Sequence, residues 1–179
     1  FMQHAALAAM ALDAGIIDVA VVAYGSNQRS QGGFKSVSEP LPFEAQFKPR
    51  NPITSYALVA SHYMHQFGAT REDLAQVAVA ARGWANLNPE SYAKGPLTVD
   101  DVLGARMVSD PLSKLDCCLV TDGGGAIVLT RKDRAADARK TPVRVIGAGE
   151  ATAQWRVAEC RDLTGTPGRQ SARDAFGMA

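Results

Sequence analysis

Three consecutive glycines, Gly123 to Gly125, separate two apolar segments and constrain the fold of this chain more than any other feature. They follow Asp122, and glycine has no Cβ, so the backbone can take positive φ there and a bulky element can approach it closely. The pattern predicts two buried strands, one through Cys117 and Cys118 and one over residues 126–130. We expect the glycines to form a bend between them that lets a helix pack against the sheet.

Composition narrows the class of ligand. Lys and Arg number 19 against 18 Asp and Glu in 179 residues, without a block of like charge, which argues against nucleic acid or an anionic membrane and favours a small molecule. No apolar run approaches the roughly 20 residues of a membrane span. The amino terminus lacks a leader pattern, and three cysteines, two of them adjacent, suit a reducing cytoplasm. Helical patterns at both ends suggest an interior piece of a longer protein.

The segments before and after the glycines alternate between helical and strand patterns. Gly15 and Gly68 each follow a helical pattern at the position of a helix C-cap, and Thr70 begins a capping-box motif. Residues 25–52 carry many turn formers without apolar period and predict a long surface excursion. The predicted helices are 1–14, 53–67, 70–87, a short one with Thr98 as N-cap, and one over 166–179. The predicted strands are 16–24, one through Cys117 and Cys118, 126–130 and 142–149. This alternation predicts an α/β fold with a mixed or parallel sheet.

Several motifs, in one order along the chain, resemble the thiolase superfamily. The Asp-Gly-Gly-Gly segment is similar to the last strand of the N-terminal thiolase half, and the Cys117-Cys118 pair resembles the sterol-carrier-protein-x branch. Two further motifs are similar to that branch: His65-Gln-Phe-Gly-Ala-Thr-Arg-Glu-Asp-Leu-Ala75 and Asn86-Leu-Asn-Pro89. The resemblance implies a partial thiolase-like α/β fold. Residues 1–24 and 107–140 would then be the later part of the first half, 25–106 the inserted loop domain, and 141–179 the start of the second half.

The resemblance also implies a function. A thiolase-like protein cleaves or forms a carbon–carbon bond of an acyl-CoA, by acyl transfer to coenzyme A, in lipid or steroid side-chain metabolism. The alternative is a nucleophile-free aldolase subunit or a carrier of lipid acyl-CoA, which the phrase Ala23-Tyr-Gly-Ser-Asn-Gln-Arg-Ser30 favours. In the family, the nucleophilic cysteine would precede Phe1 and the other catalytic motifs would follow Ala179. The family also implies a homodimer and a partner subunit of OB-fold or zinc-ribbon type.

The residues expected to bind substrate or coenzyme A come from the first helix, the strand after it and the loop domain. Arginines can pair with phosphates, and each is alternatively a solvated surface charge. His4 lies on the helix that would emerge at the active site, or else simply packs. The candidate residues are His4, Tyr24, Asn27, Arg29, Arg50, Arg71 and Arg82.

Other reactive residues have simpler interpretations. Cys117 and Cys118 are interpreted as small core residues, and Cys160 as a surface thiol beside Arg156 and Arg161. His62 and His65 lack further ligands at metal-binding spacing, so we expect no metal. The glycine run satisfies neither a phosphate-binding loop nor a dinucleotide fingerprint, because no Lys-Ser/Thr follows it.

Overall fold

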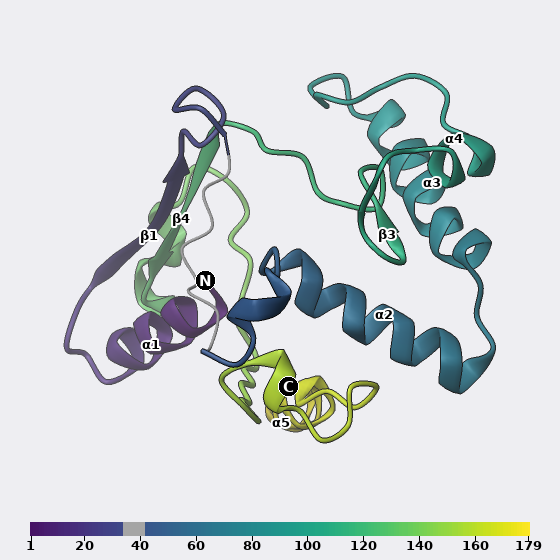
Figure 1. Cartoon of the computed structure of the whole chain (residues 1–179). Helices are drawn as coiled ribbons and strands as arrows, with labels where there is room; N and C mark the ends of the chain where they lie inside the picture. The colour runs from purple at the N-terminus through teal and green to yellow at the C-terminus, as the bar shows by residue number, and fades with distance from the viewer. Residues whose placement is uncertain (34–41) are drawn as a thin grey trace. The chain divides into compact units, whose positions relative to one another are not determined.

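The computed structural model describes residues 1–33 and 42–179, so residues 34–41 of the predicted excursion lie outside the described residues. The chain divides into two compact units (Figure 1). In the described part, the first unit comprises residues 1–33, 120–153 and 166–179, and the second comprises 42–119 and 154–165.

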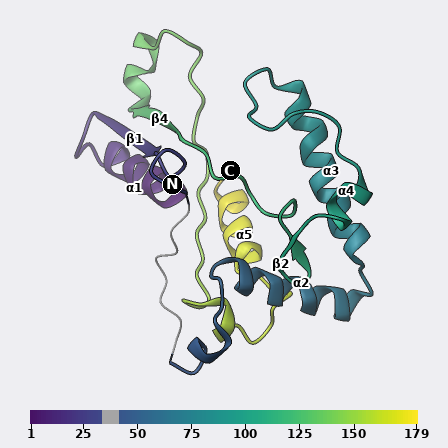
Figure 2. The same ribbon diagram turned by 45° about the horizontal axis from the view of Figure 1, so that its top comes forward.

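The first unit contains a helix and a strand pair that are far apart in sequence. Helix α1 spans Met2–Asp13 and is followed by Gly15, whose φ of 69° is the left-handed conformation that favours glycine. Strand β1 (Val19–Ser26) pairs antiparallel with β4 (Gly123–Thr130) along its whole length, and α1 contacts both strands. Figures 1 and 2 show β1 and β4 side by side with α1 next to them. The predicted first helix is confirmed, and the predicted strand begins three residues later than expected.

The glycine run does not form the predicted bend. Gly123, Gly124 and Gly125 are the first three residues of β4, opposite Ser26, Gly25 and Tyr24, and none of the three has a positive φ. A Cβ on Gly124 would lie 2.7 Å from the carbonyl oxygen of Tyr24. The missing side chain therefore lets strand β1 approach, whereas the sequence pattern suggested an approaching helix.

The predicted strand through Cys117 and Cys118 is also wrong, because this segment turns instead of extending. Ser113 organises the turn: its Oγ accepts from the Leu115 N–H at 3.2 Å, and its N–H donates to Asp116 Oδ2 at 2.7 Å. The Cys117 thiol then donates to the Ser113 carbonyl oxygen at 3.3 Å. These local hydrogen bonds compete with a strand ladder, so no strand is assigned here.

The carboxyl-terminal part of the first unit contains helix α5, Gly168–Met178, as predicted, after the short helical turn η2, Lys132–Asp137. The predicted strand over 142–149 is not formed. Instead, Gly147 and Gly149 lie against the α5 backbone so closely that a Cβ on either would collide with the carbonyl oxygen of Ala175 or Ser171. Packing against a helix thus replaces strand pairing in this segment.

The second unit is mostly helical, and its helix ends match the sequence signals. Helix α2 (Ile53–Phe67) ends at Gly68, whose φ is 67°. Thr70 and Asp73 form a reciprocal capping box at the start of α3, and Thr98 and Asp101 form another at the start of α4. The remaining elements of this unit are α3 (Arg71–Leu87), α4 (Val99–Leu103), β2 (Met107–Ser109), β3 (Leu112–Ser113), and the turns η1 (Ala45–Phe47) and η3 (Val157–Glu159).

Few side chains are fully buried in the described part of the chain. The buried apolar residues are Leu12, Ala57, Ala75, Val102 and Pro111, and Ser113 is the buried polar residue. Both strand pairs, β1 with β4 and β2 with β3, are antiparallel. Helices with small sheets give the α/β class that the sequence predicts. Within the described residues, no helix is both long and apolar enough to cross a membrane.

Candidate functional site

The carboxylate of Asp122 holds the turn that follows β1. Its Oδ1 accepts from the Arg29 backbone N–H at 2.8 Å, and both of its oxygens lie 3.2 Å from the Ser30 nitrogen. The Arg29 guanidinium donates to the Val120 carbonyl oxygen at 3.4 Å. Because β1 and β4 run antiparallel, the end of β1 meets the start of β4, and this places Asp122 beside the turn.

Electrostatics at this turn favour the ionised carboxylate. Desolvation would raise the pKa of Asp122, but hydrogen bonds from Ser30 and Arg29 and the positive charge of Arg29 outweigh it and lower the pKa below its usual value. A carboxylate that accepts from successive backbone N–H groups acts as a local clasp. We call these contacts of Asp122 with Arg29 and Ser30 the Asp122 clasp. It holds Arg29, which sequence analysis assigned to substrate binding.

Three rings gather where α1 begins beside β1. Phe1 packs edge to face against Tyr24, with ring centroids 5.1 Å apart, and against His4 at 6.3 Å. Tyr24 lies on β1 opposite Gly125 and is 54% exposed. Such geometry is the preferred one for aromatic pairs. The predicted residues His4 and Tyr24 are therefore joined through Phe1, which the sequence analysis did not single out.

Asn27 belongs to the turn that the clasp holds. Its carbonyl oxygen accepts from the Ser30 hydroxyl at 3.2 Å and from the Gln31 N–H at 3.1 Å. The first unit thus contains four of the seven predicted residues, and each lies at or near the end of β1 or on α1. Arg29 is among them, although the sequence pattern assigned it to the loop domain with the other arginines.

The other three predicted residues lie in the second unit. Arg50 is exposed, and its backbone N–H donates to Thr54 Oγ1 at 2.9 Å just before α2. Arg71 is the first residue of α3, where a cation lies at the positive end of the helix dipole. Arg82 lies on the same helix, and its guanidinium donates to the Lys94 carbonyl oxygen at 3.4 Å. The arginines are thus in three distinct settings.

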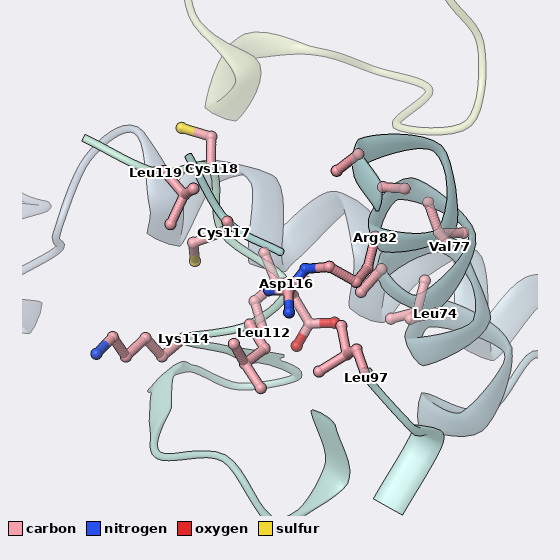
Figure 3. A pocket seen from close by; sticks show the side chains of 15 residues that line it. Leu74, Val77, Arg82, Leu97, Leu112, Lys114, Asp116, Cys117, Cys118 and Leu119 are labelled. Carbon is pink, nitrogen blue, oxygen red and sulfur yellow. The ribbon is translucent and has the colours of Figure 1, made fainter. Parts of the chain in front are cut away.

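Within the second unit, Arg82 lines a pocket between α3 and the segment 112–119 (Figure 3). Cys117 and Cys118 line it as well. Burial, followed by the negative charge of Asp116 and the neighbouring Cys118, raises the pKa of the Cys117 thiol, which makes it a poor nucleophile at neutral pH. Cys118 is exposed, so the interpretation of both cysteines as core residues is wrong for Cys118. The turn around Ser113 explains this, because the pair no longer lies in a buried strand.

The histidines of α2 and the third cysteine do not assemble a metal site. His62 and His65 are both exposed. Cys160 is partly buried and its thiol donates to the Asp162 carbonyl oxygen at 2.9 Å. Hydrogen bonds from Thr164 and Gly165 lower the pKa of Asp162 below its usual value, and desolvation opposes them. Across residues 1–33 and 42–179, no group of three or more His, Cys, Asp or Glu could hold a metal ion.

Asp122 is the residue that sequence reasoning missed. It was interpreted only as the start of a glycine bend, although its carboxylate is what contacts the predicted binding turn. The sequence did contain a signal for this contact. If two strands pair, an aspartate just before one of them can accept hydrogen bonds from a polar turn just after the other. The antiparallel pairing was the missing information.

Comparison with proteins of known structure identifies the architecture. The structure is similar to a solved "Ltp2-ChsH2(DUF35) aldolase", with a TM-score of 0.81 and 31% sequence identity over 98% of this chain and 49% of that one. The fold is thiolase-like. No protein-family model matches the chain.

Sequence relatives agree with this fold. The chain is 38% identical over 161 residues to a 17-hydroxy-3-oxo-4-pregnene-20-carboxyl-CoA lyase of Mycobacterium tuberculosis, covering 83% of this chain and 41% of the relative. It is 34% identical to a steroid side-chain-cleaving aldolase of Thermomonospora curvata (81% and 40%). It is 37% identical to an acetyl-CoA acetyltransferase of Methanothermobacter thermautotrophicus (69% and 33%). The chain therefore spans about two fifths or less of these curated relatives, and its relatives include both thiolases and steroid side-chain aldolases.

Proposed function

We propose that the protein acts on acyl-CoA thioesters and cleaves or forms a carbon–carbon bond at the β-position, in lipid or steroid side-chain metabolism. The observation that carries the proposal is the likeness of nearly the whole chain to a solved aldolase at 31% identity and a TM-score of 0.81. The matching lyase and aldolase relatives, which extend over more than four fifths of this chain, support it. Coenzyme A would then be bound as part of the substrate or product.

Two reactions fit this proposal. In thiolysis, free coenzyme A and a β-ketoacyl-CoA give a shortened acyl-CoA and acetyl-CoA, and the first step needs a cysteine thiolate. In aldol cleavage, a β-hydroxyacyl-CoA loses its hydroxyl proton to a base and splits into a carbonyl compound and a shorter acyl-CoA, without a covalent intermediate. Both reactions develop negative charge on the thioester oxygen, which a helix amino terminus or other fixed donors would stabilise.

A specific observation favours the aldol reaction. The relatives that align with more than four fifths of the chain are the lyase and the steroid aldolase, whereas the acetyltransferase aligns with 69% of it. We therefore place aldol cleavage first and thiolysis second.

The proposed ligand contacts use the residues that the sequence analysis singled out. Arg50 and Arg71 of the second unit would pair with coenzyme A phosphates, as would Arg29 of the first. His4, Tyr24 and the turn at Asn27, which the Asp122 clasp holds, would contact the acyl part. The loop-domain role of residues 25–106 remains part of this proposal.

We also propose assembly with further subunits. The name of the solved aldolase joins two components, Ltp2 and ChsH2(DUF35), which supports a partner subunit, expected from the resemblance to be of OB-fold or zinc-ribbon type. A homodimer is supported by the apolar residues that β1 and β4 expose, Val21 at 62% and Val128 at 69% among them. Sedimentation of the gene product as a concentration-independent monomer would contradict the homodimer.

The deciding experiment compares two substrates on the full gene product. A branched β-hydroxyacyl-CoA should yield a ketone and a shorter acyl-CoA without added coenzyme A, as measured by chromatography of the thioesters. Thiolysis would instead require a β-ketoacyl-CoA and free coenzyme A, and would be abolished by iodoacetamide. If the protein, alone and with its partner subunit, cleaves neither substrate, the proposed function is wrong.

A further inference from the structure

The proposed contacts leave a pocket of the second unit unexplained. It has a volume of about 480 Å³, which lies in the range of small-molecule sites. Helix α3 forms one wall and the segment 112–119 the other, as Figure 3 shows. The pocket belongs entirely to the second unit, so its description depends on that unit alone.

The walls of this pocket are apolar. Leucines from α3, from the segment before α4 and from the turn at Ser113 line it, together with alanines of α3. The leucines that face it are Leu74, Leu97, Leu112, Leu115 and Leu119. An apolar wall of this extent favours a hydrocarbon body, because each Å² of apolar surface removed from water contributes roughly 25 cal/mol.

The positive and negative charges that face the interior of the pocket offset each other. Arg82 points from α3 toward the segment that carries Asp116, whereas the Lys114 side chain points away from α3 (Figure 3). Asp116 is partly buried, and its Oδ2 accepts from the Ser113 N–H. The interior therefore presents one cation and one anion, so a ligand carboxylate near Arg82 would also face the charge of Asp116. This arrangement favours a neutral ligand.

Arg82 is suited to donate to an oxygen atom of such a ligand. A guanidinium carries five N–H donors, and its 3.4 Å bond to the Lys94 carbonyl oxygen uses one of them. That bond also anchors the side chain against the segment after α3, so the donors are held at the pocket. A neutral carbonyl or hydroxyl oxygen would complete the hydrogen bonding without adding charge.

We propose that this pocket binds the uncharged fused-ring body of a steroid-like substrate and that Arg82 donates a hydrogen bond to a carbonyl or hydroxyl oxygen on that ring. The choice of a steroid ring rests on the proposed function, since the supporting relatives are a pregnene-carboxyl-CoA lyase and a steroid side-chain-cleaving aldolase. The pocket is thereby the determinant that selects a bulky apolar substrate over a short acyl-CoA.

The test measures steroid binding without any reaction. Progesterone, a neutral 3-oxo steroid that carries no coenzyme A, is titrated into the full gene product with its partner subunit and followed by calorimetry. Ala78→Phe, which places a ring in the pocket from α3, should weaken binding at least tenfold. The matched variant Ala80→Phe, at an exposed position of the same helix outside the pocket, should bind like the wild type.

Arg82→Met keeps the apolar stem and removes the donors, so it should weaken progesterone binding roughly tenfold. Gln76→Met, at an exposed position of the same helix outside the pocket, is its control. This pair decides the question if Ala78→Phe does not fold. A steroid of the same ring system that carries a carboxylate in place of the ring oxygen should bind more weakly than progesterone, and tighter binding would overturn the neutral-ligand assignment.

The outcomes separate this inference from the proposed function. If the wild type binds no progesterone, or if both pocket variants bind it like the wild type, the inference is wrong even when acyl-CoA cleavage is observed. If progesterone binds and the pocket variants weaken it while no acyl-CoA is cleaved, the inference stands and the proposed function fails. A further supporting result would be that Ala78→Phe raises KM for a steroid acyl-CoA and leaves KM for a short acyl-CoA unchanged.

Discussion

The Asp122 clasp of the first unit joins residues 93 positions apart, whereas the capping boxes of the second unit join residues three positions apart. The first unit depends on strand pairing between β1 and β4, which lie far apart in sequence. The second depends on helix ends that their own sequence specifies. Structure that is encoded locally can form without a partner element, but the strand pair requires both halves to meet.

The two units also differ in how many apolar side chains they bury. Of the buried apolar side chains in the described residues, Leu12 is in the first unit, and Ala57, Ala75, Val102 and Pro111 are in the second. The first unit therefore gains more from backbone hydrogen bonds and close backbone approach than from a side-chain core. This contrast predicts that glycine substitutions in the strand pair have larger effects than cap substitutions in the helices.

Gly124→Val should cause the largest loss of stability. A Cβ there would lie 2.7 Å from the Tyr24 carbonyl oxygen and 3.3 Å from the Gly25 Cα, and such overpacking costs about 2 kcal/mol. The measurement is the denaturant midpoint of the full gene product. Gly125→Val is the matched control, since a Cβ at that position meets nothing within 4 Å. Equal midpoints for the two variants would show that β1 does not approach β4 as described.

Thr70→Ala should have the next largest effect, about 1 kcal/mol, because it removes the hydroxyl that accepts from the Asp73 N–H at the start of α3. Thr98→Ala should act similarly at α4, where the same box also lowers the pKa of Asp101. Helicity and thermal unfolding of the gene product report both. Thr152→Ala, at an exposed position outside the helices, should change neither. A loss at Thr152 equal to that at Thr70 would contradict the local account of helix stability.

The same contrast explains how much of the fold could be predicted. Gly68, Thr70 and Thr98 mark helix boundaries by chemistry that acts within one turn, and the structure confirms them. The glycine run was predicted wrongly to be a bend. A run of glycines is compatible with a bend, and it is equally compatible with a strand that a second strand approaches closely. Only the identity of the partner strand, which lies elsewhere in the sequence, decides between the two.

The candidate site shows the same limit. The sequence named His4, Tyr24 and Asn27 as candidate binding residues but did not predict that they lie near one another, because that depends on the packing of α1 against β1. It did not identify Asp122, since the aspartate reaches the turn only through the pairing of β1 with β4. It also missed the pocket that Arg82 lines, because the segment through Cys117 and Cys118 was expected to be a strand and instead turns around Ser113.

Gly83→Ala should stabilise the protein by about 0.5 to 1 kcal/mol, because glycine inside a helix costs backbone entropy and a Cβ at this position of α3 meets nothing within 4 Å. Gly68→Ala should do the reverse, since its φ of 67° is strained for a residue with a side chain. Opposite shifts in the denaturation midpoint would support local control in the second unit. A destabilising Gly83→Ala would mean that this face of α3 is covered in the complete protein.

The smallest expected effect is confined to the turn that the Asp122 clasp holds. Folding lowers the pKa of Asp122, so the contribution of its carboxylate is fully present above the unfolded value of about 3.9 and is lost as pH falls through the folded value. The amide proton shifts of Arg29 and Ser30, followed by NMR, should therefore titrate together with a midpoint below that unfolded value. In Asp122→Asn the neutral amide oxygen can still accept, so both amides should stay at one shift across this range. A titration that persists in the asparagine variant would assign the effect to another carboxylate. It would also mean that the pairing of β1 with β4 alone fixes the turn, so that the first unit depends on strand pairing where the second depends on local helix caps.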